Sequence, residues 1–127
     1  MKKLKTIPFE FVLEQLYALD PVVKPMFGCH AVYVKDKIML ILRNREDFPG
    51  DNGVWIATTP EHHESLWRDF PSMRSIRMFG EKITGWQNLP YEAGDFEESV
   101  LRVCELIMRK DMRIGKIPKP RKKKKQE

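Results

Sequence analysis

The sequence has few cysteines and no long apolar run. Its 127 residues contain two cysteines, too few for a disulfide framework, so a reducing compartment is expected. The longest aliphatic run, Ile38–Leu42, is far shorter than a bilayer span. Pro8, Glu10 and Glu14 interrupt the stretch after the basic start, where a secretory signal needs apolar residues. We therefore expect a cytoplasmic protein without membrane attachment.

Motifs for catalysis and metal binding are also missing. There is no Walker loop, no G-x-G-x-x-G run and no G-x-S-x-G elbow. Cys29 and His30 are neighbours in a predicted strand and point to opposite faces. His62, His63 and the cysteines lack the paired short spacings of a structural zinc site. The sequence predicts no catalytic residue, no metal site and no cofactor, and an unrecognised enzyme is the third hypothesis.

Positive charge is unevenly distributed. The formal net charge is +5, yet residues 1–108 contain 13 basic and 16 acidic residues. From Arg109 to Lys125 there are ten Lys or Arg residues and one acid, Asp111. The basic character therefore belongs to the C-terminal end, and the rest of the chain does not predict a broad basic face.

Hydrophobic periodicity predicts an α+β fold. The predicted order is helix, three strands, helix, two strands, helix, which favours a mainly antiparallel sheet, an α-βββ-α-ββ-α roll. The last helix is the clearest element, because Asp95 suits its start and apolar residues recur at helical spacing after it. The predicted helices are Pro8–Leu19, Pro60–Asp69 and one from Phe96, with Phe96, Val100, Val103 and Ile107 as its apolar stripe and Leu101, Cys104 and Met108 widening it. The predicted strands are Met26–Val34, Ile38–Arg43, Val54–Thr58, Ser75–Phe79 and Ile83–Gln87.

The chain divides into two predicted parts. Residues 1–112 form the α+β domain, and residues 113–127 form a disordered basic tail. Two prolines, Pro118 and Pro120, and the run Lys122–Lys125 leave this tail with nothing to pack.

Several segments resemble a known bacterial family. Met26-Phe27-Gly28 enters a strand, Tyr33 follows five residues after the glycine, and Lys37–Leu42 and Trp86–Pro90 follow in order. Over roughly residues 6–110, this pattern resembles the TfoX N-terminal domain-like family. The resemblance implies an α/β roll similar to secretion-chaperone-like folds, with no established catalytic residues. Cys29 replaces a second glycine of the family, and its helical C-terminal domain is absent, so a competence role is not carried over.

The basic tail is the first candidate site. Each Lys or Arg can neutralise a phosphate and release a counterion, which drives association with nucleic acid irrespective of sequence. The alternative is a solubilising extension that binds nothing specifically. The candidate nucleic-acid-binding residues are Arg113, Lys116, Lys119, Arg121, Lys122, Lys123, Lys124 and Lys125.

An apolar groove is the second candidate site. Large side chains beside glycines could line a shallow groove for a partner peptide or a second subunit, although most aromatic residues should lie in the core. Its residues are Met26, Phe27, Gly28, Met78 and Phe79. The leading hypothesis is a non-enzymatic binding module with a regulatory role, in which the tail associates with nucleic acid. The alternative is a homodimeric or chaperone-like protein-interaction domain.

Overall fold

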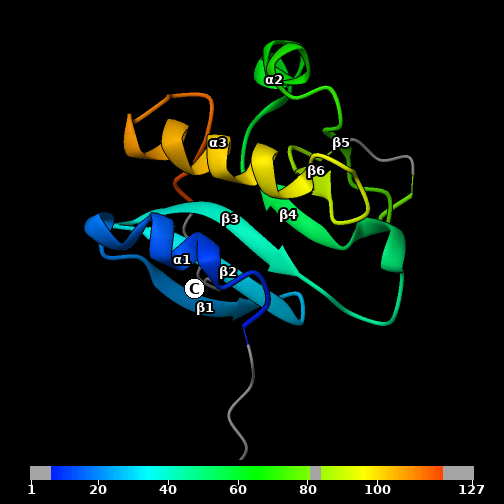
Figure 1. Cartoon of the computed structure of the whole chain (residues 1–127), viewed down its shortest axis with the longest axis horizontal. Coiled ribbons are helices and arrows are strands. Elements are labelled where there is room, and N and C mark those ends of the chain that lie inside the picture. The colour runs from blue at the N-terminus through cyan, green and yellow to red at the C-terminus, as the bar shows by residue number, and fades with distance from the viewer. Residues whose placement is uncertain (1–6, 81–83, 119–127) are drawn as a thin grey trace, which may run out of the picture.

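The computed structural model describes residues 7–80 and 84–118, which form one antiparallel sheet with helices α1 and α3 on one of its faces (Figure 1). The strand order is β1-β2-β3-β4-β6-β5, which confirms the predicted α+β class with an antiparallel sheet. The strands are β1 (Val22–Met26), β2 (Cys29–Val34), β3 (Lys37–Arg43), β4 (Gly53–Ile56), β5 (Arg74–Ser75) and β6 (Gln87–Pro90). The helices are α1 (Phe11–Gln15), α2 (His63–Asp69) and α3 (Phe96–Met108), with short 3-10 turns η1 (Tyr17–Leu19), η2 (Pro49–Asp51) and η3 (Pro60–His62).

The two faces of the sheet bury different sets of side chains. On β4, Val54 and Ile56 join the core beneath the helices, whereas Trp55 joins a second cluster on the other face. On β2, Val32 and Ala31 divide in the same way. This alternation follows from the two-residue repeat of a strand.

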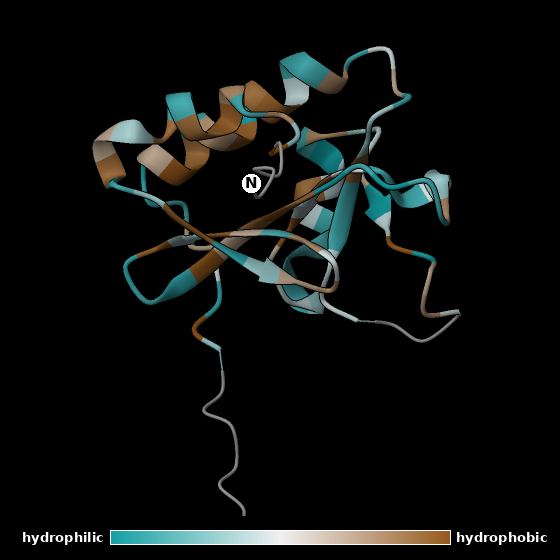
Figure 2. Ribbon diagram, turned by 90° about the horizontal axis from the view of Figure 1, so that it is seen from below, coloured by the Kyte–Doolittle hydropathy of each residue, from teal (hydrophilic) through white to brown (hydrophobic). Residues whose placement is uncertain are grey.

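No α-helix of the described ranges lies over the second face of the sheet (Figure 2). The segment from Ile76 to Phe79 and the side chain of Trp86 cover it instead. The second cluster contains Cys29, Ala31, Ile38, Ile41, Trp55, Ala57 and Ile76, with Met26, Tyr33, Met78 and Trp86 packed against it at its margin. The protein therefore has one face covered by helices and one covered by an irregular segment.

Helix α3 begins where its sequence predicts, and its apolar stripe is buried. The buried side chains include Phe96, Val100, Val103, Cys104 and Ile107. Two details differ from expectation. The carboxylate of Asp95 does not cap the helix but accepts a hydrogen bond from Ser72 Oγ at 2.8 Å. Leu101 and Met108 were expected to widen the buried stripe, and this is wrong, because both side chains are exposed at the edge of the stripe.

The first helix is shorter than Pro8–Leu19. Helix α1 spans only Phe11–Gln15, and a 3-10 turn follows it. Phe9 has a φ of +55°, which no right-handed helix allows. Its ring packs instead against the rings of Tyr91 and Phe96, at centroid distances of 5.3 and 5.1 Å. Aromatic packing therefore overrides helix propensity at this end.

Strand β1 is absent from the sequence prediction, which assigned Met26–Val34 to a single strand. The chain instead forms a hairpin, in which β1 pairs with β2 across a two-residue turn at Phe27 and Gly28. Pro25 lies within β1 and has no N–H to donate. A proline is tolerated there because β1 is at the edge of the sheet and pairs on one side only.

The fourth and fifth predicted strands are also displaced. Ser75–Phe79 was predicted as a strand, but β5 covers only Arg74–Ser75. The next strand begins at Gln87 rather than ending there, and residues 81–83 lie outside the described residues. The carboxylate of Asp51 accepts the backbone N–H groups of Arg77 and Met78, so these donors are satisfied without a partner strand.

The predicted second helix, Pro60–Asp69, is divided. The 3-10 turn η3 precedes α2, and the side chain of Thr59 makes no capping hydrogen bond. Leu66 is buried, and the half-exposed Trp67 donates its Nε1–H to Gln87 Oε1 at 2.7 Å. This bond links α2 to strand β6.

The folded body continues past its predicted boundary at residue 112. Ile114 is buried, and Gly115 donates its N–H to the carbonyl oxygen of Ala57 at 2.7 Å. Lys116 and Ile38 exchange two backbone hydrogen bonds of 2.9 and 3.0 Å. The prediction that the tail starts at 113 is therefore wrong for residues 113–116, because Ile114 is buried and Lys116 forms an isolated bridge to Ile38 of β3. The tail from Lys119 lies outside the described residues.

Among residues 7–80 and 84–118 there is no helix with the length and apolar character that a bilayer crossing requires.

Candidate interaction surface

The two Met-Phe-Gly segments of the sequence meet on the second face of the sheet. In both, the methionine packs at the margin of the second cluster and the phenylalanine is exposed. In both, the glycine adopts a left-handed conformation, with φ +73° at Gly28 and +78° at Gly80. The rings of Phe27 and Phe79 lie edge to face at a centroid distance of 6.0 Å. We call these two rings the aromatic pair.

Phe27 has an unusual backbone conformation for its residue type. Its φ is +55°, in the left-handed region that a two-residue hairpin turn of type I′ requires at both central positions. Glycine, asparagine and aspartate are the residues that commonly occupy this position, because a bulky side chain crowds the backbone there. The side chain is also 51% exposed, so its burial compensates for this strain only in part. Residues with such strain are found disproportionately at functional sites.

The turn strain at Phe27 gives a stability prediction. Phe27→Asn and Phe27→Ala both remove the ring, but only asparagine favours the left-handed conformation. We expect the asparagine variant to be more stable than the alanine variant by about 0.5 to 1 kcal/mol. Urea unfolding of the two variants measures the difference, and equal midpoints would show that the turn is not strained at this residue.

The segment that carries Phe79 is anchored by a buried carboxylate. Asp51 is fully buried and accepts the N–H groups of Arg77 and Met78 at 2.8 Å each. Its other oxygen is 3.1 Å from Nη1 of Arg74, whose Nη2 also donates to the carbonyl oxygen of Gly50. The backbone beside Phe79 is therefore fixed to the turn η2 that precedes β4.

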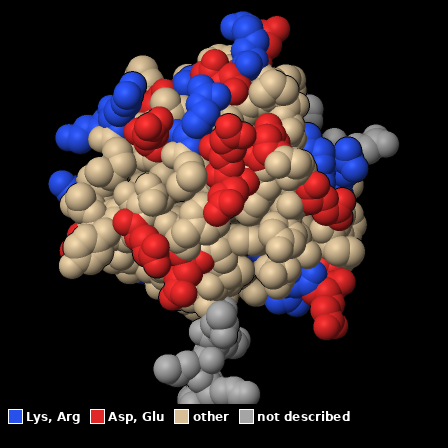
Figure 3. Space-filling view, in the orientation of Figure 1, with Lys and Arg blue, Asp and Glu red and all other residues tan. Residues whose placement is uncertain are grey.

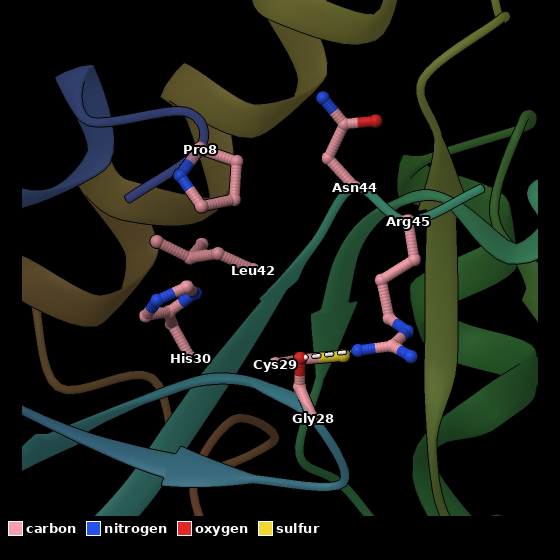
Figure 4. Close-up of a pocket in the computed structure, with 7 residues that line it drawn as sticks. All are labelled: Pro8, Gly28, Cys29, His30, Leu42, Asn44 and Arg45. Carbon is pink, nitrogen blue, oxygen red and sulfur yellow. Dashed lines mark hydrogen bonds between the residues drawn. The ribbon is translucent and has the colours of Figure 1, made fainter. Parts of the chain in front are cut away.

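A second set of hydrogen bonds fixes the turn that carries Phe27. Nη1 of Arg45 donates to the carbonyl oxygen of Gly28 at 2.9 Å (Figure 4). Nε of Arg45 donates to Asp47 at 2.8 Å. The thiol of Cys29 donates to the carbonyl oxygen of Phe27 at 3.5 Å. Hydrogen bonds therefore fix the backbone segments that carry both phenylalanines of the aromatic pair.

A pocket of about 290 Å³ lies beside the Phe27–Gly28 turn (Figure 4). Its lining residues are Pro8, Gly28, Cys29, His30, Leu42, Asn44 and Arg45. Burial raises the pKa of the Cys29 thiol, and the guanidinium groups of Arg43 and Arg45 oppose this rise only in part. Little thiolate is therefore present at neutral pH, and a nucleophilic role is disfavoured.

Cys104 and His63, two further side chains that could act as metal ligands or in catalysis, are buried in the fold. Burial raises the pKa of Cys104 to about 12, as expected for a core thiol. Burial also lowers the pKa of His63, whose Nε2 lies 3.2 Å from the carbonyl oxygen of Gly85. In the described ranges, no three His, Cys, Asp or Glu side chains are grouped as metal ligands.

Arg113, one of the predicted nucleic-acid-binding residues, forms ion pairs with two aspartates of the folded body. Its Nη1 lies 3.0 Å from Asp69 Oδ2, and its Nη2 lies 2.9 Å from Asp111 Oδ2. Hydrogen bonds from Arg113 Nε and Nη2 to its carboxylate lower the pKa of Asp111. Because the pKa of Asp111 is lowered in the folded state, the Arg113–Asp111 pair stabilises the fold at pH values above the ordinary carboxyl pKa. This stabilisation is lost as the pH falls through the lowered pKa. Arg113 is therefore a structural residue that anchors the C-terminal segment.

The structure shows where on the folded body the basic tail begins. Lys116 has an exposed side chain, although its backbone is paired with Ile38. The described chain then ends at Pro118 on the side of the sheet away from the helices (Figure 2). Candidates Lys119, Arg121 and Lys122–Lys125 lie outside the described residues.

The helix layer is acidic. The segments 7–20 and 91–108, which contain α1 and α3, have eight acidic residues and one basic residue. Acidic side chains accordingly run across the middle of the face that these helices form (Figure 3). A polyanion would be repelled by this face, and the opposite side carries the aromatic pair and the start of the tail.

Comparisons with known proteins place the chain in no family. The fold is an α+β fold with a six-stranded antiparallel sheet, but no family model and no solved structure matches the chain. It is similar to "Uncharacterized protein R849" of Acanthamoeba polyphaga mimivirus, with 28% identity over 81 residues. That match covers 61% of this chain and 57% of the viral protein, so it spans little more than half of the relative's length. The resemblance to the TfoX N-terminal domain stays a prediction.

Sequence reasoning named the five groove residues but missed what supports them. Nothing in the sequence distinguishes Asp51 from the other acids of its polar loop, since its partners lie 23 or more residues away. Arg45 likewise reaches back 17 residues to Gly28. A signal was present in the repeated Met-Phe-Gly segment itself, whose two copies the fold brings together.

Proposed function

We propose that this protein is a non-enzymatic binding module with a regulatory role, which associates with nucleic acid through its basic C-terminal segment without reading base sequence. The observation that carries the proposal is the separation of charge across the fold. The helix layer is acidic, whereas the basic segment leaves from the opposite side of the sheet (Figures 2 and 3). A polyanion can then approach one side of the body and meet the tail there.

The residues that serve this function are fewer than the sequence predicts. Arg113 already neutralises Asp69 and Asp111, so releasing it to a phosphate would break two ion pairs. The proposal therefore assigns the attraction to Lys116 and to the cationic residues that follow it. These are Lys119, Arg121, Lys122, Lys123, Lys124 and Lys125.

We also propose distant kinship with the TfoX N-terminal domain and a cytoplasmic location. The ground for this kinship is the sequence resemblance of Met26–Gly28 and Lys37–Leu42. The two cysteines are buried and unpaired, which fits a reducing cytoplasm. Neither thiol is activated, which supports a binding role over a cysteine-dependent enzyme.

One observation favours a second candidate function, a protein-interaction or homodimer domain. Phe27 and Phe79 are large apolar side chains exposed side by side, and such patches often mark protein interfaces. Self-association measured by light scattering separates this candidate from the first.

The tail hypothesis predicts salt-dependent binding. With about five tail charges engaged on duplex DNA, log K should fall against log salt with a slope of about −4 to −5. Affinity should be micromolar or weaker at physiological salt and equal for unrelated sequences. Fluorescence anisotropy of labelled duplexes over a range of salt concentrations measures both quantities.

Two variants identify the residues responsible. A chain ending at Pro118 keeps the pairing of Lys116 with Ile38, so it should fold normally and lose the binding. In the matched control, Lys122–Lys125 are replaced by glutamine, so the length stays while four charges go, and the slope should shrink by about 3 to 4. Full affinity in the shortened chain would contradict the proposal and assign the contact to the folded body.

A further inference from the structure

We propose that the aromatic pair, Phe27 and Phe79, is a stacking platform for unpaired bases, so that the protein prefers single-stranded to double-stranded nucleic acid. This inference rests on the proposed function and adds to it a site on the folded body. Neither packing of the core nor attraction by the basic tail explains why Phe27 and Phe79 are exposed side by side.

The two rings are exposed enough to receive bases. Phe27 is 51% exposed and Phe79 is 43% exposed, although each belongs to a residue type that favours the core. Their planes are inclined at 68°, so they present ring surfaces in two directions. This arrangement suits two successive bases that are splayed apart, each on its own ring, rather than one base between parallel rings.

The platform is held rigid before any ligand arrives. One ring stands on the turn fixed by Arg45 and Gly28, and the other on the segment fixed by Asp51. Trp55 supports Phe27 from the buried side at a centroid distance of 6.4 Å. Little conformational entropy is therefore lost when a base stacks on either ring.

The exposed charges beside the platform are mixed, since Glu46 and Asp47 adjoin Arg45, so they do not repel a polyanion as the helix layer does. Arg45 and Arg77 have exposed side chains next to the two turns. Asp47 offsets Arg45, so the basic tail must supply most of the attraction and the rings supply the selectivity. The acidic helix layer excludes the opposite face as a binding site (Figure 3).

The tail and the platform are within reach of one strand of nucleic acid. Lys116 pairs with Ile38, and Ile38 lies across from Tyr33 on β2. Cys29, next to the Phe27–Gly28 turn, is four residues from Tyr33 along β2, or about 13 Å, and the two strand spacings between Lys116 and Tyr33 add about 10 Å across the sheet. A short oligonucleotide can therefore contact both, whereas a duplex keeps the faces of its bases stacked inside and meets only the tail.

The experiment compares a labelled oligothymidine of about 12 nucleotides with a duplex of equal length, using the full chain and fluorescence anisotropy. The variants are Phe27→Asn, which suits the turn, and Phe79→Ala. The matched control is Tyr17→Ala, because Tyr17 is an exposed aromatic residue of η1, within segment 7–20 of the helix layer. Each ring variant should weaken binding of the oligothymidine about tenfold and leave duplex binding unchanged. Thermal unfolding establishes that each variant is folded.

The outcomes separate this inference from the proposed function. If the ring variants bind both probes as the wild type does, the inference is wrong while the tail proposal stands. If the wild-type protein binds neither probe, the proposed function fails and this inference fails with it. If the wild-type protein is a dimer that Phe79→Ala converts to a monomer without changing selectivity for single strands, the aromatic pair is a contact between copies and the inference is overturned.

Discussion

Replacing Val103 with aspartate is expected to lower the free energy of unfolding by about 3 to 5 kcal/mol, a large part of what a domain of this size has. Val103 is completely buried on α3, between the helix and the sheet. Valine and aspartate are similar in size, so the cost arises from an unpaired charge in an apolar core rather than from a cavity.

A control on the same helix isolates burial as the cause. Leu101 is 39% exposed, so Leu101→Asp introduces the same charge two residues away at the solvent edge. We expect its free energy of unfolding to change by less than about 1 kcal/mol. Urea unfolding followed by tryptophan fluorescence measures both variants, and equal effects would show that the buried face of α3 is assigned incorrectly.

The second large effect is expected for Asp51→Ala, with a loss of about 3 to 5 kcal/mol. This change removes the partner of Arg74 and leaves two backbone donors, at Arg77 and Met78, without their acceptor. The segment that covers the second face should then detach, and Trp55 beneath it should become accessible to solvent.

Tryptophan fluorescence and quenching by acrylamide report this detachment. Glu46→Ala serves as the matched control, because Glu46 is an exposed carboxylate of the same polar loop. Its removal should change stability little. An Asp51→Ala protein with wild-type stability would mean that the Ile76–Phe79 segment is held by apolar packing alone.

Local periodicity was sufficient to predict the elements whose side chains follow a regular pattern. The stripe from Phe96 to Ile107 identifies α3, and the alternation on β4 assigns Val54 and Trp55 to opposite faces. These elements bury side chains on a regular repeat, so the sequence pattern and the structure carry the same information.

The remaining elements depend on partners that are distant in sequence. Strand β1 was not predicted from the sequence because it contains Pro25. A proline argues against a strand unless that strand is already known to lie at the edge of the sheet. Phe9 leaves the helical region because of two rings more than 80 residues away. Residues 113–116 look like the start of a tail until Ile38 and Ala57 supply their hydrogen bonds. None of these long-range contacts is visible in local propensity.

The candidate surface was only partly predictable for the same reason. The composition of the two Met-Phe-Gly segments indicated apolar residues beside flexible turns. The ring centroids of Phe27 and Phe79 lie 6.0 Å apart because of the β1–β2 hairpin and the hydrogen bonds of Asp51. No short-range pattern in the sequence indicates either of these.

The two edges of the sheet also bear on how the protein behaves when crowded. On one edge, β1 contains Pro25 and the charged Lys24; on the other, β5 is only two residues long. An edge with missing donors, a lysine or little length offers a poor template for another chain to add a strand. Despite its wholly antiparallel sheet, the native protein should therefore resist growth into fibrils at high concentration.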